Sequence, residues 1–461
     1  MISFDTSFIP PQKGVYLVGG SLRDTLLGRK PLDYDIVVKE NPLAIAEEIT
    51  KYRNGRLVFM GKPGQQLIRV VFGNTLWDIS VMKGNSIEED LSHRDFTINA
   101  LAYEAITEKL IDISGGLKDL KKRRIRMVSA SIFKEDPLRL LRAYRLAASF
   151  GFRIDPSTDS CIKGDAHLIH QTAGERIRDE LFKILSIQDS FTFISQMQES
   201  GLLSELLPEI GALKDCCRNK HHAYDAQEHT LKSFCALEAL LKNVGSYFPE
   251  HTNPLNCWFD NRKNPLLKCA MLLHDIGKPL CETRDKSGNI HFWGHEKTGS
   301  ILAEKIVKRL RFSNHEIEYI VFMVRNHLRP LSLFLARQNQ TLTDRGIARF
   351  FMKCDKNALD ILLHAVADFQ TKKEAFEDGG IKAFIRFINE LIQVYFTRYL
   401  PVRTAKPLLS GRDLIEVLNL KPSPLFKTIL SRVEEAHLAG DVGNRDEALA
   451  LARTIVLNKK A

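Results

Sequence analysis

The chain has 461 residues, which exceeds the size of one small core and predicts about three or four compact units. Hydrophobic residues make up 44% and charged residues 26%, as in ordinary globular proteins. The sequence has no run of eighteen apolar residues, and its first residues lack a basic segment followed by an apolar one. We therefore expect a cytoplasmic protein without a membrane segment. A net charge of +10 favours a polyanionic partner such as nucleic acid, without establishing one.

The predicted elements change character along the chain. Up to about residue 130, the apolar segments VYLVGG, YDIVV, LIRVVFG and LWDIS predict strands, whereas SLRDTLLG and LAIAEEITKY predict helices, an α+β pattern. From Glu135 onward the periodicity is helical almost without a break. A Pro-rich and Asn-rich stretch at 246–265 predicts a loop or insertion, and a second break at 398–411 precedes the last helices.

The glycine turn of VYLVGGSLRD is the first candidate site. Gly19 and Gly20 let the backbone approach a ligand closely, and the free N–H groups at the start of the next helix favour a phosphate. Arg23 adds a charged donor. The alternative is a plain strand-to-helix turn that needs glycine for its conformation alone.

Two aspartates follow inside the β-branched segment LDYDIVV. Asp33 and Asp35 are two positions apart on a predicted strand, so both side chains point to one face, where they can share a divalent cation. Asp78 in TLWDIS is a third candidate carboxylate on another predicted strand. The alternative is an edge strand with a solvated acidic face.

The segment SHRDFTINALAY offers groups for a nucleotide. Arg94 can donate to a phosphate, and Asp95 can accept a hydrogen bond from a ribose hydroxyl, which would favour ribonucleotides. Asn99 lies one helical turn from Asp95 and is expected to brace it. An ordinary capped helix start is the alternative interpretation.

The segment EDPLRLLRAYR pairs an acceptor with a guanidinium. Asp136 precedes a proline as a natural N-cap, and Arg139 lies three residues on. Together they complement cytosine and adenine, whose amino group donates beside an accepting ring nitrogen, whereas uracil and guanine present the opposite polarity. An N-cap followed by a solvated basic helix is the alternative.

These motifs, in this order over residues 15 to about 185, resemble the class II tRNA nucleotidyltransferase and bacterial poly(A) polymerase family. The resemblance implies a polymerase-β-like nucleotidyltransferase head with a small mixed sheet at 1–134 and an all-α neck for base recognition at 135–212. It implies Mg²⁺ at Asp33 and Asp35. It also implies nucleotide phosphates at Gly19, Gly20 and Arg23, a nucleotide near Arg142 and Arg145, and support of the base-selecting pair by Glu175 and Arg176. His93 stands where the family usually has arginine.

A second set of metal-binding residue types lies in the middle of the chain. An adjacent His-Asp pair, with a histidine well upstream and an aspartate well downstream, can converge on a metal: His229, His274, Asp275 and Asp368. The set resembles an HD-domain phosphohydrolase, which implies a domain at 213–385 that holds a divalent metal of unknown identity. The resemblance also implies additional ligands or substrate contacts from His295 and His327, and a phosphate contact from Lys278. Satisfied core histidines and an inactive relic are the alternatives.

The last segment, 386–461, resembles the C-terminal helical region that contacts tRNA in one branch of the family, with Ser423-Pro424 in place of the usual Gly-Pro. We therefore expect a template-independent enzyme that adds CMP, AMP or both from CTP and ATP to the 3′ end of an RNA, with tRNA as the expected acceptor. A poly(A) polymerase is the alternative, but the basic aromatic stretch expected of that branch is absent from MGKPGQQLIRVVFG. An HD phosphohydrolase with an RNA-binding N-terminal half and a non-enzymatic RNA-binding protein are further alternatives.

Overall fold

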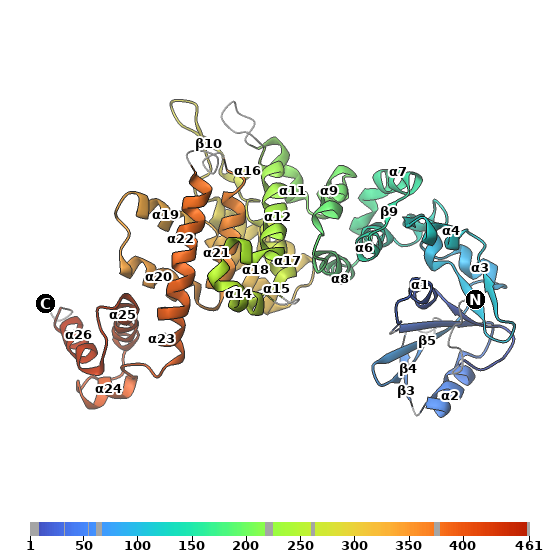
Figure 1. Cartoon of the computed structure of the whole chain (residues 1–461), viewed down its shortest axis with the longest axis horizontal. Coiled ribbons are helices and arrows are strands. Elements are labelled where there is room, and N and C mark those ends of the chain that lie inside the picture. Colours follow the sequence, from blue (N-terminus) through green and yellow to red (C-terminus); the bar gives the residue numbers. More distant parts are fainter. Residues whose placement is uncertain are drawn as a thin grey trace. The chain divides into compact units, whose positions relative to one another are not determined.

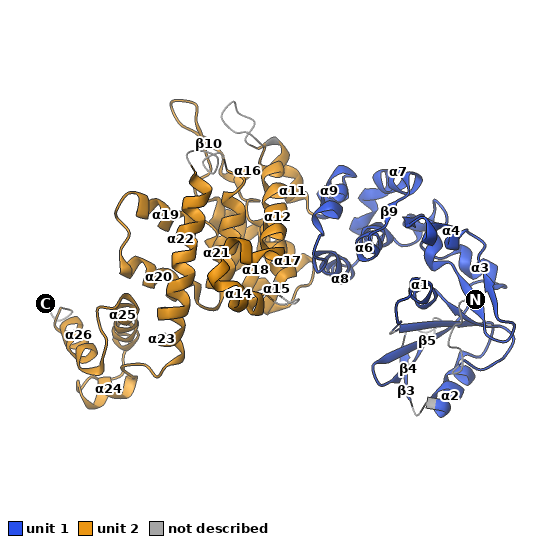
Figure 2. Cartoon of the chain, viewed as in Figure 1, with its two compact units in different colours: residues 1–206 blue, residues 207–461 orange. Residues whose placement is uncertain are grey.

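The computed structural model describes residues 9–31, 33–53, 55–60, 67–216, 225–259, 263–372 and 379–458 (Figure 1). The chain divides into two compact units, residues 1–206 and 207–461 (Figure 2). The break lies close to the boundary expected at 212, whereas the boundaries expected at 134 and 385 stay predictions. Within the described ranges, no helix combines the length and apolarity that a bilayer crossing requires. Residues 61–66 of the stretch MGKPGQQLIRVVFG lie outside the described residues.

The first unit begins with the expected mixed sheet. Its strands are β1 (Val15–Val18), β2 (Asp33–Val38), β3 (Arg56–Met60), β4 (Leu67–Phe72), β5 (Thr75–Val81), β6 (Ala102–Glu104) and β7 (Lys109–Ile111). They lie in the order β3-β4-β5-β2-β1-β6-β7. Strands β2 and β5 run parallel, and the other neighbours run antiparallel. The four predicted strands are confirmed, while β3, β6 and β7 were not predicted.

Strand β2 is half buried along its length. Its β-branched end, Ile36, Val37 and Val38, lies in the core, whereas its first half, with Asp33 and Asp35, is exposed. Helices α1 (Gly20–Leu26) and α2 (Pro42–Arg53) pack against the sheet. The buried end anchors the strand, so the two aspartates project from a fixed backbone.

The neck is helical, as predicted. It contains α5 (Ile132–Glu135), α6 (Arg139–Phe150), α7 (Pro156–Asp165), α8 (Gly174–Leu185), α9 (Phe191–Glu199) and α10 (Leu202–Leu206). Between sheet and neck lie α3 (Ile87–Ser92), the 3₁₀ turn η1 (Thr97–Asn99) and α4 (Gly116–Lys121). Helix α6 buries Leu140, Leu141 and Tyr144 and packs against α8. Its polar face, which carries Arg139 and Arg142, is left for other contacts.

The second unit is a helical bundle. Its central helices are α12 (Ala226–Lys242), α15 (Lys263–Leu273), α17 (His295–Arg309), α18 (Asn314–Asn326) and α21 (Ala358–Phe369). Around them lie α16 (Lys278–Cys281), α19 (Arg329–Gln338), α20 (Asp344–Cys354) and α22 (Gly380–Val394). Every residue of α21 is buried, including Asp360, His364 and Asp368. Ionisable groups on such a helix need partners, because burying them alone costs free energy.

The structure corrects the expectation of a loop at 246–265, because short helices fill most of this stretch. They are α13 (Val244–Tyr247), η4 (Pro249–His251) and α14 (Thr252–Trp258). Pro249 and Pro254 lie in the first turns of η4 and α14, where proline removes no helical hydrogen bond. The later break is narrower than 398–411, since α23 (Leu400–Thr404) precedes a non-helical stretch at 405–410.

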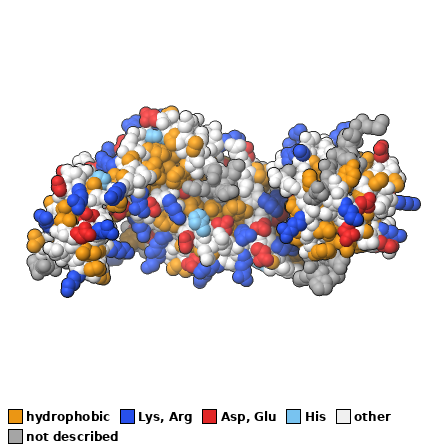
Figure 3. Space-filling model, turned by 90° about the horizontal axis from the view of Figure 1, so that it is seen from below, with side chains coloured by type: hydrophobic (Ala, Val, Ile, Leu, Met, Phe, Trp, Pro, Cys, Tyr) orange, Lys and Arg blue, Asp and Glu red, His pale blue; other side chains and the backbone are white. Residues whose placement is uncertain are grey.

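Three last helices form a small core of their own. They are α24 (Gly411–Glu416), α25 (Leu425–Ala439) and α26 (Arg445–Leu457), and Leu414, Ile429 and Val433 lie among the buried residues. On the face drawn in Figure 3, lysine and arginine side chains are spread over both units with acidic side chains among them.

Candidate nucleotide and metal sites

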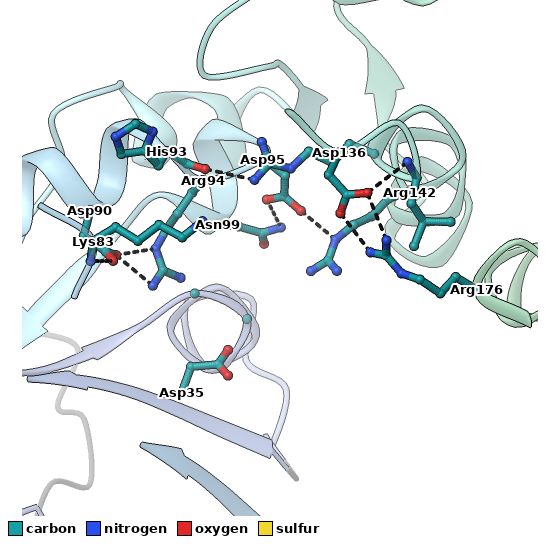
Figure 4. Close-up of a pocket in the computed structure, with 14 residues that line it drawn as sticks. Asp35, Lys83, Asp90, His93, Arg94, Asp95, Asn99, Asp136, Arg142 and Arg176 are labelled. Carbon is teal, nitrogen blue, oxygen red and sulfur yellow. Dashed lines mark hydrogen bonds and ion pairs between the residues drawn. The ribbon is translucent and has the colours of Figure 1, made fainter. Parts of the chain in front are cut away.

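A recess of about 280 Å³ opens in the first unit where residues of the sheet, of η1 and of the neck meet (Figure 4). It is lined by nine residues expected from the sequence: Gly19, Gly20, Asp35, Arg94, Asp95, Asn99, Asp136, Arg139 and Arg142. Lys83, Asp90, His93, Leu138 and Arg176 complete the lining. The structure therefore brings the glycine turn, a strand carboxylate and both base-selecting candidates to one place.

The three candidate carboxylates share one region of the sheet. Asp35 and Asp78 are directly opposite each other in the parallel pairing of β2 and β5. Arg69 binds both oxygens of Asp78, each at 2.7 Å, so Asp78 already has a counterion. Asp35 keeps solvent contact, yet desolvation by the surrounding protein raises its pKa, with Arg94 opposing and Asp78 adding to the rise. Asp35 lines the recess, whereas Asp33 and Asp78 are not among its lining residues.

Gly19 lies between a carboxylate and a guanidinium. Its φ of +72° is one that residues with a side chain rarely adopt. A Cβ at this position would lie 2.9 Å from Nη1 of Arg94 and 3.1 Å from Oδ2 of Asp35. The bare Cα therefore keeps open the space between the negative and the positive group, which is where a phosphate with its cation fits by charge.

Arg23 has several protein partners beside the recess. Its side chain is buried, donates to Oδ1 of Asn99 at 2.6 Å and lies over the ring of Phe150 at 4.5 Å. It also binds Asp24, with Nε 2.9 Å from Oδ1. Arg23 is not among the residues that line the recess, but it orients Asn99, which is; its expected phosphate contact stays a prediction.

Asp95 is held by three groups. Asn99 donates to its Oδ1 at 2.9 Å, as predicted, and the backbone N–H of Phe96 donates to the same oxygen at 2.7 Å. Arg142 pairs with Oδ2 at 2.6 Å. Burial alone would raise the pKa of Asp95, but Arg142 and these hydrogen bonds outweigh it and lower the pKa. Asp95 is therefore a fixed, ionised acceptor at the recess wall.

Asp136 and Arg139 both line the recess, and the backbone N–H of Arg139 donates to the carbonyl of Asp136 at 3.0 Å, while their side chains have other partners. Arg176 binds both oxygens of Asp136, at 3.2 and 2.8 Å, while Arg139 donates to the backbone carbonyl of His93 at 2.9 Å. The expected N-cap contact of Asp136 is present, because its Oδ1 accepts from the backbone N–H of Leu138 at 3.3 Å, although helix α6 itself begins at Arg139. Asp136 has extended backbone, because residues before proline avoid helical angles.

Arg145 lies outside the recess lining, because its Nε pairs with Glu180 at 2.5 Å on the side where α6 meets α8. Lys83 and Asp90 were missed by the sequence analysis although both line the recess. Asp90 accepts from the backbone N–H of Lys83 at 2.8 Å and pairs with Arg94 at 3.0 Å. The spacing of Asp90 and Arg94, four residues apart, was the available signal.

A second cluster lies inside the helical bundle of the second unit. It contains two groups whose donor atoms lie within 4.8 Å of one another: His229, His274 and Asp368 form the first, and Asp275, His295 and His327 the second. All six are buried residues that the sequence had predicted. Lys278 lies beside them, with Nζ 2.5 Å from Oδ2 of Asp275.

The histidines of this cluster are oriented for metal binding. Nδ1 of His274, His295 and His327 donates to the carbonyls of Met271, Phe292 and Val324, at 2.8, 2.7 and 2.8 Å. A carbonyl can only accept, so Nδ1 carries a proton, and Nε2 is the nitrogen that faces the cluster and can coordinate a metal once it is deprotonated. Such backbone partners fix the tautomer of metal-binding histidines in proteins. The donor set therefore fits a divalent cation.

Four family models match the chain. Their descriptions are 'Poly A polymerase head domain' at residues 15–126, 'Probable RNA and SrmB-binding site of polymerase A' at 151–213, 'HD domain' at 227–350, and 'tRNA nucleotidyltransferase domain 2 putative' at 300–452. The HD match includes His229, His274 and Asp275. Asp368 lies beyond its end, on α21.

Two curated relatives align over almost the whole chain. The A-adding tRNA nucleotidyltransferase of Deinococcus radiodurans is 31% identical over 96% of this chain and 96% of its own length. The CC-adding tRNA nucleotidyltransferase of Synechocystis is 29% identical over 98% of this chain and 96% of its own length. Among solved structures, the Thermotoga maritima CCA-adding enzyme complexed with tRNA has a TM-score of 0.64, at 22% identity over 96% of this chain and 91% of that one. That structural likeness concerns the fold.

Proposed function

Because the chain belongs to the family of tRNA nucleotidyltransferases and bacterial poly(A) polymerases, we propose that it adds CMP, AMP or both to the 3′ end of tRNA, using CTP and ATP and releasing pyrophosphate. One observation carries the proposal. The recess gathers the glycine turn, a strand carboxylate and the two side chains proposed to select the base within one unit, which supports binding of a ribonucleoside triphosphate there.

Asp33 and Asp35 are the residues that would hold Mg²⁺, since both offer hard oxygen ligands from one face of β2. Bound there, Mg²⁺ neutralises phosphate charge and activates the attacking 3′-hydroxyl. Arg94 would bind the phosphates beside Gly19, and Asp95 would accept from the ribose. The protein then contributes mainly by positioning the two reactants, which is worth several kcal/mol in well-oriented reactions.

Base choice would fall to Asp136 and Arg139. The carboxylate accepts from the amino group of cytosine or adenine, and the guanidinium donates to the neighbouring ring nitrogen. Both side chains line the recess, and Arg176 holds the carboxylate in a fixed plane. Uracil and guanine would leave a donor or an acceptor unpaired, which costs about 1–3 kcal/mol.

The acceptor is proposed to be tRNA because the A-adding and CC-adding relatives align over nearly their whole lengths. Those two relatives differ in the nucleotides that their names give, so CC, A and complete CCA addition are all compatible with the family. The deciding experiment offers tRNAs that lack all, only the last or none of the 3′-CCA nucleotides, with CTP or ATP separately. Products read at single-nucleotide resolution distinguish CC, A, CCA and poly(A) addition. Absence of any incorporation would refute the proposal.

The second unit is proposed to hold a divalent transition metal and to hydrolyse phosphate esters at RNA ends. Four imidazoles and two carboxylates converge there, and imidazole nitrogen favours first-row transition ions over Mg²⁺. Lys278, beside Asp275, would contact the phosphate. Phosphatase and 2′,3′-cyclic phosphodiesterase assays on the metal-loaded protein test this activity. We expect nucleotide addition and ester hydrolysis both to take place in the cytoplasm.

A further inference from the structure

His364 is a buried histidine of α21 to which no role has yet been given. Its side chain has no solvent exposure, and neither ring nitrogen has a hydrogen-bond partner among the described residues. It lies four residues before Asp368, so both side chains project from the same face of the helix. A buried polar group without a partner costs about 1–3 kcal/mol, so an apolar residue would be the more stable choice for packing alone.

The ring of His364 lies against the metal-binding cluster. Its centroid is 5.4 Å from that of His274 and 6.0 Å from that of His327, and so it contacts one histidine of each group. A neutral imidazole has one ring nitrogen with a lone pair, so His364 offers a donor atom to a cation.

We propose that His364 supplies a further nitrogen ligand to the divalent cation bound by His229, His274 and Asp368. The proposal rests on the metal site proposed above. We choose this group over the second because it contains Asp368, one turn further along α21, and His274, whose ring lies beside that of His364. A fourth protein ligand would give a donor set of three imidazoles and one carboxylate, a combination that suits transition ions better than Mg²⁺.

Binding requires a small movement of the His364 side chain. The donor atoms of the first group lie within 4.8 Å of one another, and His364 is not part of that set. We expect a rotation about its side-chain bonds to turn a nitrogen toward the cation, because the ring centroid already lies 5.4 Å from that of His274. Coordination would then give one of the two ring nitrogens of His364 the partner that it lacks among the described residues.

The test uses cobalt(II) with the full-length protein, because its visible absorption reports the number and type of ligands. We compare wild type with H364L, H364Q and the control H251L. His251 is also buried, has an unpartnered Nε2 and packs on Phe396, outside the cluster. We expect both His364 variants to lose about 10- to 100-fold in cobalt affinity and to change the absorption spectrum. H251L is expected to retain both.

The outcomes separate the two proposals. If wild type binds cobalt and the His364 variants match it in affinity and spectrum, the role of His364 is refuted and the metal site stands. If wild type binds no cobalt in the second unit, both are refuted. Circular dichroism checks that each variant is folded, and H364Q keeps the side chain polar in case H364L does not fold.

Discussion

Asp136 and Arg176 form a two-point ion pair, with Nη1 3.2 Å from Oδ1 and Nη2 2.8 Å from Oδ2. The pair joins the start of the neck to helix α8 and leaves Asp136 at the recess wall. A carboxylate bound at both oxygens cannot rotate freely. Arg176 therefore holds Asp136 in the orientation in which the proposed function has it accept a hydrogen bond from a base.

Arg176→Ala should loosen base selection. Losing a charge-assisted contact costs about 1.5–3 kcal/mol, so we expect kcat/KM for CTP and ATP to fall roughly 10- to 100-fold. Discrimination against UTP should narrow at the same time, because Asp136 becomes free to turn. Single-turnover kinetics with each nucleotide measure both effects. Arg178→Ala, which removes a surface pair with the adjacent Asp179, is the control; equal discrimination in both variants would contradict the prediction.

Asp33→Ala and Asp35→Ala should abolish addition of C and A alike. We expect a loss of roughly 10³-fold or more, because several kcal/mol of charge stabilisation disappear with the metal ligands. The order of preference among bound nucleotides should not change, since Asp136 and Arg139 are intact. Incorporation assays and nucleotide competition binding measure the two properties. Glu40→Ala, an exposed carboxylate just beyond the same strand, should behave like wild type.

Gly19→Ala should weaken triphosphate binding, whereas Gly28→Ala should not. Both glycines have a φ of +72°, but a Cβ at Gly28 meets nothing within 4 Å, while one at Gly19 meets Arg94 and Asp35. Both variants carry the strain of a positive φ, about 1–2 kcal/mol. The difference in CTP affinity between the two variants therefore measures the effect of the space that a Cβ fills beside Arg94 and Asp35. Titration with CTP should show at least a tenfold weaker affinity for Gly19→Ala alone, and equal affinities would count against the predicted phosphate position.

Metal binding in the second unit should strengthen with pH. Burial lowers the pKa of His274, but Asp275 and Asp368 outweigh burial and raise this pKa to about 9 before a metal binds. A protonated imidazole cannot coordinate, so below about pH 9 the cation must displace one proton. We expect affinity to rise about tenfold per pH unit between pH 7 and 9. Calorimetry in buffers of different ionisation enthalpy measures the released proton, and a flat affinity profile would exclude this linkage.

The sequence predicted the elements that carry strong periodicity and the residues that carry charge. The two aspartates of β2 were placed correctly because alternation on a strand fixes their common face. The position of Arg23 was not predictable in the same way. Helix α1 is short, and the ring of Phe150 that covers Arg23 lies more than a hundred residues further along the chain.

Other errors came from residues whose effect depends on their exact neighbours. The proline-rich stretch at 246–265 was predicted as a loop, but its prolines lie in the first turns of short helices, where they are tolerated. The HD motif includes Asp368 but not His364, so the sequence did not single out His364. Both residues lie in the same heptapeptide, HAVADFQ. Only the packed bundle reveals that the His364 ring has no hydrogen-bond partner among the described residues.

The hydrogen bonds that orient His274, His295 and His327 all run to a carbonyl three residues earlier. Each ligand's tautomer is therefore encoded in four consecutive residues, independently of the helices that later surround it. A single-residue insertion inside one of these turns would leave every metal ligand present and still misdirect a lone pair. Conversely, a grafted four-residue turn should carry a correctly protonated imidazole into a new scaffold.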